Sequence, residues 1–149
     1  MRHSQISELI WCGGALQPGD WEQLYARGVR IDLSLQEEAR DQFGNLQPEA
    51  ELWLPAQDWY MPSLDQLALA TSFIDAAVRL AKPIVVHCKH GIGRAPLTVA
   101  AYLVTGGMST HEAIEFVRHR RPIVDPNYGQ IAIVEQFERL YRSGAPSSS

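Results

Sequence analysis

The stretch that decides the fold of this chain is residues 85–97, Val-Val-His-Cys-Lys-His-Gly-Ile-Gly-Arg-Ala-Pro-Leu. It begins as a β-branched apolar run, passes through a segment with two glycines and one cysteine, and runs into an apolar helical pattern over residues 97–104. The stretch therefore predicts a strand, a tight loop and the start of a helix.

The predicted loop has the composition of an anion-binding site. Backbone N–H groups in such a loop can point inward, and the helix dipole adds partial positive charge at its first turn. Cys88 opens the loop, and thiols in such surroundings ionise readily and become nucleophiles. Arg94 follows six residues later, where its guanidinium can hold two oxygens of the same anion. This combination indicates attack on phosphorus.

The same residues, taken one by one, also allow other interpretations. Cys88 could be an ordinary buried cysteine, and the Gly-x-Gly a simple turn. A metal site on His87, Cys88 and His90 is disfavoured because no further cysteine follows. The remaining histidines also lack ligand spacing: His3, His111 and His119. The whole string favours a phosphate-binding loop, and we expect neither a metal nor a cofactor.

Residues 87–94, His-Cys-Lys-His-Gly-Ile-Gly-Arg, match a His-Cys-(x)5-Arg signature. Through it the chain resembles the cysteine-dependent protein tyrosine phosphatase superfamily, and its compact length and Gly-x-Gly-Arg ending resemble the dual-specificity branch. The resemblance runs from about Ile6 to Tyr141, although only the loop is strongly diagnostic. It implies that Cys88 and Arg94 are catalytic and that His87 supports the loop from behind. The implied phosphate-binding residues are Lys89, His90, Gly91, Ile92, Gly93 and Arg94.

Length and composition favour one globular domain. The chain has 149 residues, 46% of them hydrophobic, which suits a single core. Its net charge of −4 argues against general nucleic-acid binding. Two cysteines give no disulfide framework, and neither a secretory signal nor a membrane span is recognisable. We expect a monomer in the reducing cytoplasm.

The hydrophobic pattern predicts an α/β fold. Strands are expected at 8–14, 29–35, 51–55 and before Cys88, and helices at 21–26, 64–80, 97–104, 109–121 and from about 126 onward. A strand, a crossover helix and a strand build a parallel sheet with ligand sites at the carboxyl ends of its strands. We expect a single domain with a central, mostly parallel sheet of four to five strands flanked by helices. The catalytic domain would span residues 1–142 and a disordered tail residues 143–149.

Phosphate-ester cleavage also needs an acid that protonates the leaving oxygen. Asp58 stands on a loop after a predicted strand and matches the general-acid position of the dual-specificity family. Trp59 and Tyr60 beside it could shield its carboxyl group. Asp65 is a weaker candidate, because Ser63 precedes it as a helix cap and an acidic residue there favours the helix dipole.

Several features keep two interpretations. Cys12 either packs in a strand or forms an oxidative pair with Cys88, as in some relatives. Residues 36–48 are either a solvated segment or a loop that borders the site.

The cluster Arg118, Arg120 and Arg121 either faces an acidic substrate or favours a helix C-terminus. Gln130 falls where several relatives place a residue that orients the hydrolytic water.

The resemblance implies a two-step mechanism through a phosphocysteine, with Asp58 as acid and then as base. Most relatives carry Ser or Thr directly after the arginine, but here Ala95 is followed by Pro96, which resembles the phosphatases of regenerating liver. We expect breakdown of the phosphoenzyme to be slow.

The substrate class stays open in the sequence. Phosphotyrosine or phosphoserine/threonine in proteins is the leading expectation. Lys89 and His90 add cationic character that would favour a phosphoinositide or an RNA 5′-phosphate. A module that binds phosphate with slow turnover is the alternative from another functional class, and Ala95 keeps it open.

Overall fold

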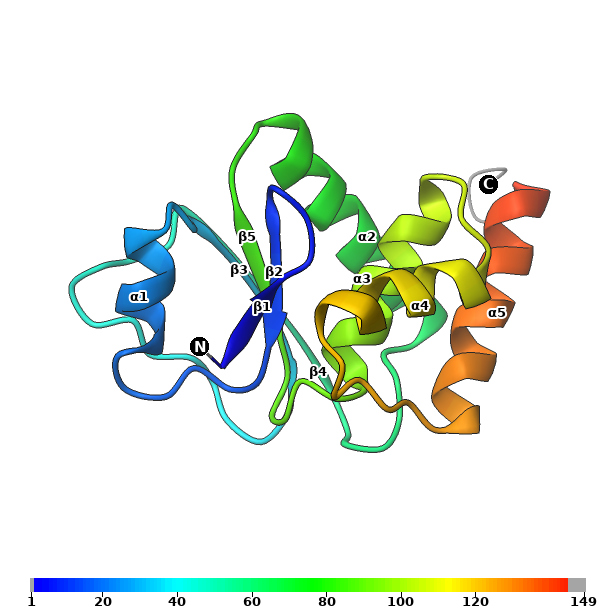
Figure 1. The fold of residues 1–149 in the computed structure, drawn as a ribbon, viewed down its shortest axis with the longest axis horizontal. Coiled ribbons are helices and arrows are strands. Elements are labelled where there is room, and N and C mark those ends of the chain that lie inside the picture. Colours follow the sequence, from blue (N-terminus) through cyan, green and yellow to red (C-terminus); the bar gives the residue numbers. More distant parts are fainter. Residues whose placement is uncertain (1, 145–149) are drawn as a thin grey trace.

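A computed structural model describes residues 2–144, which form an α/β domain with a five-stranded sheet between two helical layers (Figure 1). The strand order is β1-β2-β5-β3-β4, and only the short edge strand β1 runs antiparallel to its neighbour. This confirms the expected mostly parallel sheet, although the sequence pattern missed β1. The strands are β1 (His3–Gln5), β2 (Ile10–Gly13), β3 (Ile31–Gln36), β4 (Ala50–Ala56) and β5 (Ile84–His87).

Helices cover both faces of the sheet unequally. One short helix lies on one face, and the other four lie on the opposite face (Figure 1). Among these four, the helix over residues 94–105 contacts β5 and the other three helices. The helices are α1 (Asp20–Ala26), α2 (Leu64–Arg79), α3 (Arg94–Thr105), α4 (Thr110–Arg120) and α5 (Tyr128–Ser143). The central position of α3 explains why most of its residues are buried.

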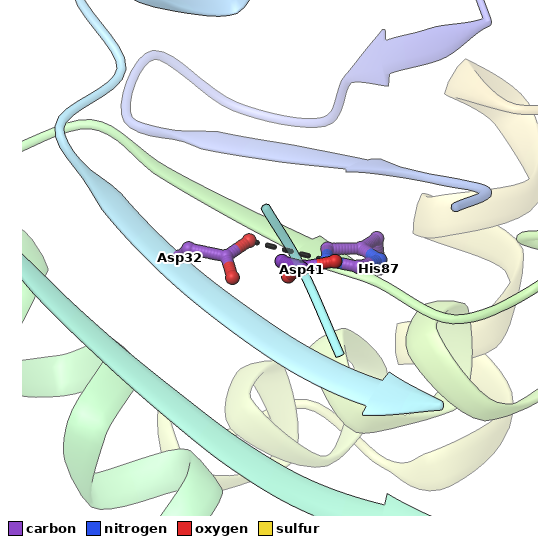
Figure 2. A group of neighbouring side chains, drawn as sticks. All are labelled: Asp32, Asp41 and His87. Atoms are coloured by element: carbon purple, nitrogen blue, oxygen red, sulfur yellow. Dashed lines mark hydrogen bonds and ion pairs between the residues drawn. The ribbon is translucent and has the colours of Figure 1, made fainter. Parts of the chain in front are cut away.

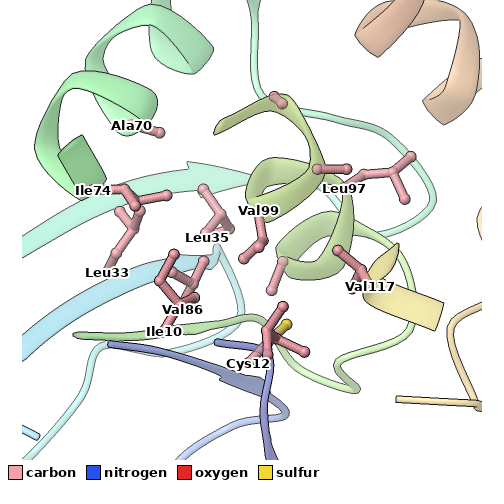
Figure 3. Packing of buried hydrophobic residues seen from close by; sticks show 14 of the residues in the cluster. Ile10, Cys12, Leu33, Leu35, Ala70, Ile74, Val86, Leu97, Val99 and Val117 are labelled. Atoms are coloured by element: carbon pink, nitrogen blue, oxygen red, sulfur yellow. The ribbon is translucent and has the colours of Figure 1, made fainter. Parts of the chain in front are cut away.

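The two faces carry separate hydrophobic clusters because successive strand residues point to opposite faces. In β2, Ile10 and Cys12 join the large cluster beneath α2–α5, whereas Trp11 faces α1. Figure 3 shows the large cluster gathered around α3. The smaller cluster consists of Trp11, Trp21, Leu24, Val29, Phe43 and Val85.

Helix starts agree with the sequence except at two places. Ser63 caps α2 as expected, and Ser109 caps α4 in the same way, each within a reciprocal capping box. α1 was expected over residues 21–26 but begins at Asp20, with Gly19 as its cap, and the Asp20 carboxylate accepts from Gln17 N and pairs with Arg2. α3 begins at Arg94 rather than Leu97, with Pro96 tolerated in its first turn.

The expected tail is only partly described. Ser143 ends α5 and Gly144 follows it in the left-handed conformation, so the helix extends past the predicted boundary at residue 142. Residues 145–149 of the tail lie outside the described residues. At the other end of the domain, the parallel strands β4 and β5 finish at the same edge of the sheet, and the loops that follow them carry Asp58 and Cys88.

Candidate active site

Cys88 directly follows β5 and lies at the base of the loop that leads into α3. Its Sγ accepts hydrogen bonds from Gly91 N at 3.3 Å and from Ala95 N at 3.4 Å, and the residue is only 2% exposed. Amide donors and the positive end of a helix therefore both face the sulfur, an arrangement that stabilises a thiolate.

Arg94 is the first residue of α3, and its side chain is almost completely buried. Glu38 accepts from Nη1 at 2.9 Å and from Nη2 at 3.0 Å, and Ala56 O accepts from Nη1 at 2.7 Å. Its Nε is buried and has no hydrogen-bond partner among the described residues. A buried donor of this kind fits an oxygen of a bound phosphate.

Asp58 follows β4 and lies at the mouth of the same site. Its Oδ1 is 3.4 Å from Arg94 Nη2, its Oδ2 is 4.0 Å from His90 Nε2, and its side chain is 38% exposed. Asp58 and Cys88 line one small cavity of about 60 Å³. Asp65, its rival as acid, lies in the first turn of α2 and does not line this cavity.

The backbone between Cys88 and Arg94 is sharply curved. Gly91 adopts a φ of +68°, and a Cβ there would lie 2.5 Å from both Arg121 Nη2 and Gly13 C. Glycine is therefore required by conformation and by space. Lys89 and His90 are exposed, and His90 lines the cavity, while Ile92 O accepts from Asp125 N at 3.0 Å.

Arg121 fixes the loop from below, a role that the sequence did not reveal. Its Nε donates to Gly91 O at 2.7 Å, and its Nη2 lies 3.5 Å from His90 O. Its Nη1 donates to Arg2 O, just before β1, and to Ser4 Oγ within β1. Arg118 and Arg120 do not join it, because Arg118 pairs with Glu115 and Arg120 stacks on Phe116.

His87 is buried behind the loop between two carboxylates (Figure 2). Its Nε2 lies 2.7 Å from Asp41 Oδ2 and 3.2 Å from Asp32 Oδ1. Burial alone would lower the pKa of His87, but the two carboxylates raise it to about 10. Burial raises the pKa of Asp32 to about 8, although the charge of His87 opposes the rise. At neutral pH the cluster therefore holds a protonated His87 and one charged carboxylate, which form an ion pair.

The same three groups are the candidate metal ligands among the described residues, with their ligand atoms within 4.8 Å of one another. However, both carboxylates approach the same nitrogen, Nε2, at hydrogen-bond distances. That nitrogen carries a proton between Asp32 and Asp41, so the geometry fits a proton-sharing ion pair rather than a metal centre.

The segment after β3 borders the site. Of the two interpretations of residues 36–48, the structure supports a loop that borders the site, because Glu38 reaches Arg94 and Asp41 reaches His87. No local pattern distinguishes these two acids from their exposed neighbours. Contacts across 56 and 46 positions of the chain give them their roles.

Two further sequence alternatives find their places. Cys12 packs in the large hydrophobic cluster as a free thiol, and burial raises its pKa (Figure 3). Gln130 lines the small cavity, and its Nε2 donates to Tyr60 O at 3.0 Å. Ala95 is fully buried and faces Cys88 with its backbone N–H, so it supplies no hydroxyl.

The fold and the sheet-edge loop define a phosphatase domain of the cysteine-dependent class. The family profile "Dual specificity phosphatase, catalytic domain" matches residues 21–140. Human dual specificity phosphatase 28 is 31% identical over 144 residues, which cover 93% of this chain and 79% of that protein. The chain therefore belongs to the dual specificity phosphatase family, within the cysteine-dependent protein tyrosine phosphatase superfamily.

Two other similarities widen the comparison. The phosphatidylglycerophosphate phosphatase PTPMT2 of Arabidopsis thaliana is 38% identical over 91 residues, 60% of this chain and 40% of that protein. The solved structure of PTPMT1 in complex with PI(5)P has the same fold, with a TM-score of 0.88 at 22% identity, over 97% of this chain and 99% of that one. Several curated relatives are much longer, and the chain spans only 25% to 40% of their length. Within residues 2–144, no helix is long and apolar enough to cross a membrane.

Proposed function

We propose that this chain hydrolyses phosphate monoesters through a phosphocysteine intermediate, with residues 1–142 as its catalytic domain. The observation that carries the proposal is the arrangement around Cys88 Sγ. Two backbone N–H groups approach the sulfur, Arg94 at the end of the same loop has an Nε with no partner among the described residues, and Asp58 shares the cavity. Nucleophile, oxyanion donors and acid thus meet within the reach of one phosphoryl group.

The first step transfers the phosphoryl group to the enzyme. The Cys88 thiolate attacks phosphorus in line, an S–P bond forms, and the P–O bond to the leaving group breaks. Asp58 gives its proton to the departing oxygen, while Arg94 and the amides of residues 89–94 hold the other phosphate oxygens.

The second step restores the enzyme. Asp58, now a carboxylate, takes a proton from water as that water attacks phosphorus, and the S–P bond breaks to release phosphate and thiolate. Because Ala95 offers no hydroxyl to the sulfur, the thiolate lacks one donor in this step. Slow breakdown of the phosphoenzyme follows from this, as does the alternative of a phosphate-binding module with little turnover.

Phosphotyrosine or phosphoserine/threonine in a protein is the first substrate class that we propose. The match to the dual specificity phosphatase profile supports this class. A phosphoinositide or RNA 5′-phosphate is the second candidate. It is supported by the exposed His90, which lines the cavity, by the exposed Lys89 next to it in the chain and, for lipids, by the similarity to the phosphatidylglycerophosphate phosphatase PTPMT2 and to PTPMT1 in complex with PI(5)P.

A reactive thiolate requires reducing surroundings, so we infer that the protein works in the cytoplasm. We also propose that it is a monomer.

Hydrolysis of an aryl phosphate tests the proposed activity. It should be abolished in Cys88→Ser and weakened in Asp58→Ala. Stoichiometric binding of phosphate esters without release of phosphate would instead support the binding module.

A further inference from the structure

At the start of α5, the side-chain amides of Asn127 and Gln130 each form hydrogen bonds through both their oxygen and their nitrogen. Asn127 Oδ1 accepts from Gln130 N at 2.8 Å, and Gln130 Oε1 accepts from Asn127 N at 3.1 Å. These oxygen atoms form a capping box. The nitrogen ends point elsewhere, because Asn127 Nδ2 donates to Trp59 O at 2.8 Å and Gln130 Nε2 donates to Tyr60 O at 3.0 Å.

The capping function alone does not require these amide nitrogens. Two other helices of the chain, α2 and α4, have the same reciprocal box with a serine hydroxyl as the cap, at Ser63 and Ser109. A serine would therefore cap α5 as well. Asparagine adds a donor that reaches the loop carrying Asp58, residues 57–62, which we call the acid loop.

The acid loop has two hydrogen bonds of its own, from Tyr60 N to Gln57 O at 3.1 Å and from Trp59 N to Asp58 Oδ1 at 3.0 Å. Trp59 adopts a φ of +72°, a left-handed conformation that is costly for a bulky residue, and its side chain is 72% exposed. Packing of the ring therefore does little to hold the turn. The two carbonyls that follow Asp58 are those that accept from α5.

We propose that Asn127, together with Gln130, positions the general acid by bonding the acid loop to the start of α5. The proposal rests on the proposed function, in which Asp58 protonates the leaving oxygen. Asn127 does not line the cavity, so it acts through the loop and not on the substrate. Gln130 lines the cavity, and Asn127 is therefore the cleaner position to test.

The test compares Asn127→Ser with the wild type on aryl phosphates whose leaving phenols differ in acidity. Serine keeps the cap but lacks the donor that reaches Trp59 O. A positioned acid contributes about 10²–10⁴-fold, mainly for poor leaving groups. We expect kcat/KM to fall about 10- to 100-fold with a weakly acidic phenol and less than about threefold with p-nitrophenol. The basic limb of the pH profile should also flatten.

Asp58→Asn is the reference variant, and the double variant completes a cycle. If Asn127 acts through Asp58, the double variant should be no slower than Asp58→Asn alone. Additive losses, or an unchanged leaving-group dependence in Asn127→Ser, would overturn the proposal. If Asp58→Asn itself shows normal leaving-group dependence, the acid assignment is wrong, which is a separate failure of the proposed function.

Stability is checked in parallel. The melting temperature of Asn127→Ser should match that of the wild type, because the cap is kept. Asn127→Asp keeps the capping oxygen in the same shape, and it replaces the donor that reaches Trp59 O by a charged oxygen. If Asn127→Ser proves unstable, Asn127→Asp takes its place in the test and should show the same selective loss with weakly acidic phenols. A normal leaving-group dependence in Asn127→Asp would contradict the proposal.

Discussion

Glu38 and Arg94 stand 56 positions apart in the chain and meet in a two-point ion pair, with 2.9 Å between Oε1 and Nη1 and 3.0 Å between Oε2 and Nη2. Ala56 O accepts a further bond from Nη1, so three bonds fix the guanidinium plane. This leaves Nε as a buried donor with no hydrogen-bond partner within residues 2–144. The orientation of the Arg94 guanidinium therefore depends on a carboxylate from the loop after β3.

Replacing Glu38 by Gln should lower kcat/KM for an aryl phosphate about tenfold, roughly 1.4 kcal/mol, because a neutral amide holds the guanidinium less firmly. Steady-state kinetics measure this. Glu37→Gln is the matched control, since Glu37 is exposed and forms no ion pair with the residues that the structure describes. Equal effects at the two positions would show that the charge of the segment matters and that the ion pair does not.

Arg121→Lys should impair the loop while leaving a positive charge in place. Lysine cannot bond Gly91 O, Arg2 O and Ser4 Oγ at once, as the guanidinium does. We expect weaker binding of inorganic phosphate and a loss of about tenfold in kcat/KM, the effect of losing roughly one hydrogen bond to a charged group. Arg120→Lys, at the exposed neighbouring position, should behave like the wild type, and a similar loss there would refute the role of Arg121.

The buried cluster of His87, Asp32 and Asp41 predicts a pH-dependent stability. The pKa of His87 is raised from 6.5 to about 10 and that of Asp32 from 3.8 to about 8, so both groups bind protons more tightly in the folded state. Their stabilisation is complete only below the unfolded pKa values and is lost as the pH rises through the folded ones. The free energy of unfolding should therefore fall between about pH 7 and pH 10.

Urea unfolding measured across this range tests the prediction. Asp32→Asn removes one of the two titrating groups and should flatten the fall in unfolding free energy. A wild-type curve that is level from neutral to alkaline pH would mean that the cluster does not share protons as its geometry indicates.

Ala95 predicts the kinetics of the second step. Stopped-flow mixing with an aryl phosphate should give a burst of phenol followed by slow turnover. Ala95→Ser should raise the steady rate about tenfold and shrink the burst, because its hydroxyl adds about one hydrogen bond to the leaving thiolate. Product formation that is linear from the first turnover would exclude a slow second step.

The features that could be predicted from the sequence are those determined by residues close together in the chain. Cys88, the loop amides and Arg94 lie within seven consecutive residues, and the apolar periodicity set out the parallel strands and four of the helices that cover one face. Local pattern could not reveal Glu38, Asp41 or Arg121, because their functions arise from partners 30 to 56 positions away. The capping of α5 was equally local, but the bond from Asn127 to Trp59 spans 68 positions.

The central claim is that Cys88 carries the phosphoryl group during turnover. Rapid acid quenching during the burst, followed by mass spectrometry of the digested protein, measures this directly. We predict a phosphoryl group on the peptide that contains Cys88, in an amount equal to the burst, and none in Cys88→Ser. Release of phosphate by the wild type with no modified Cys88 at any quench time would contradict the account.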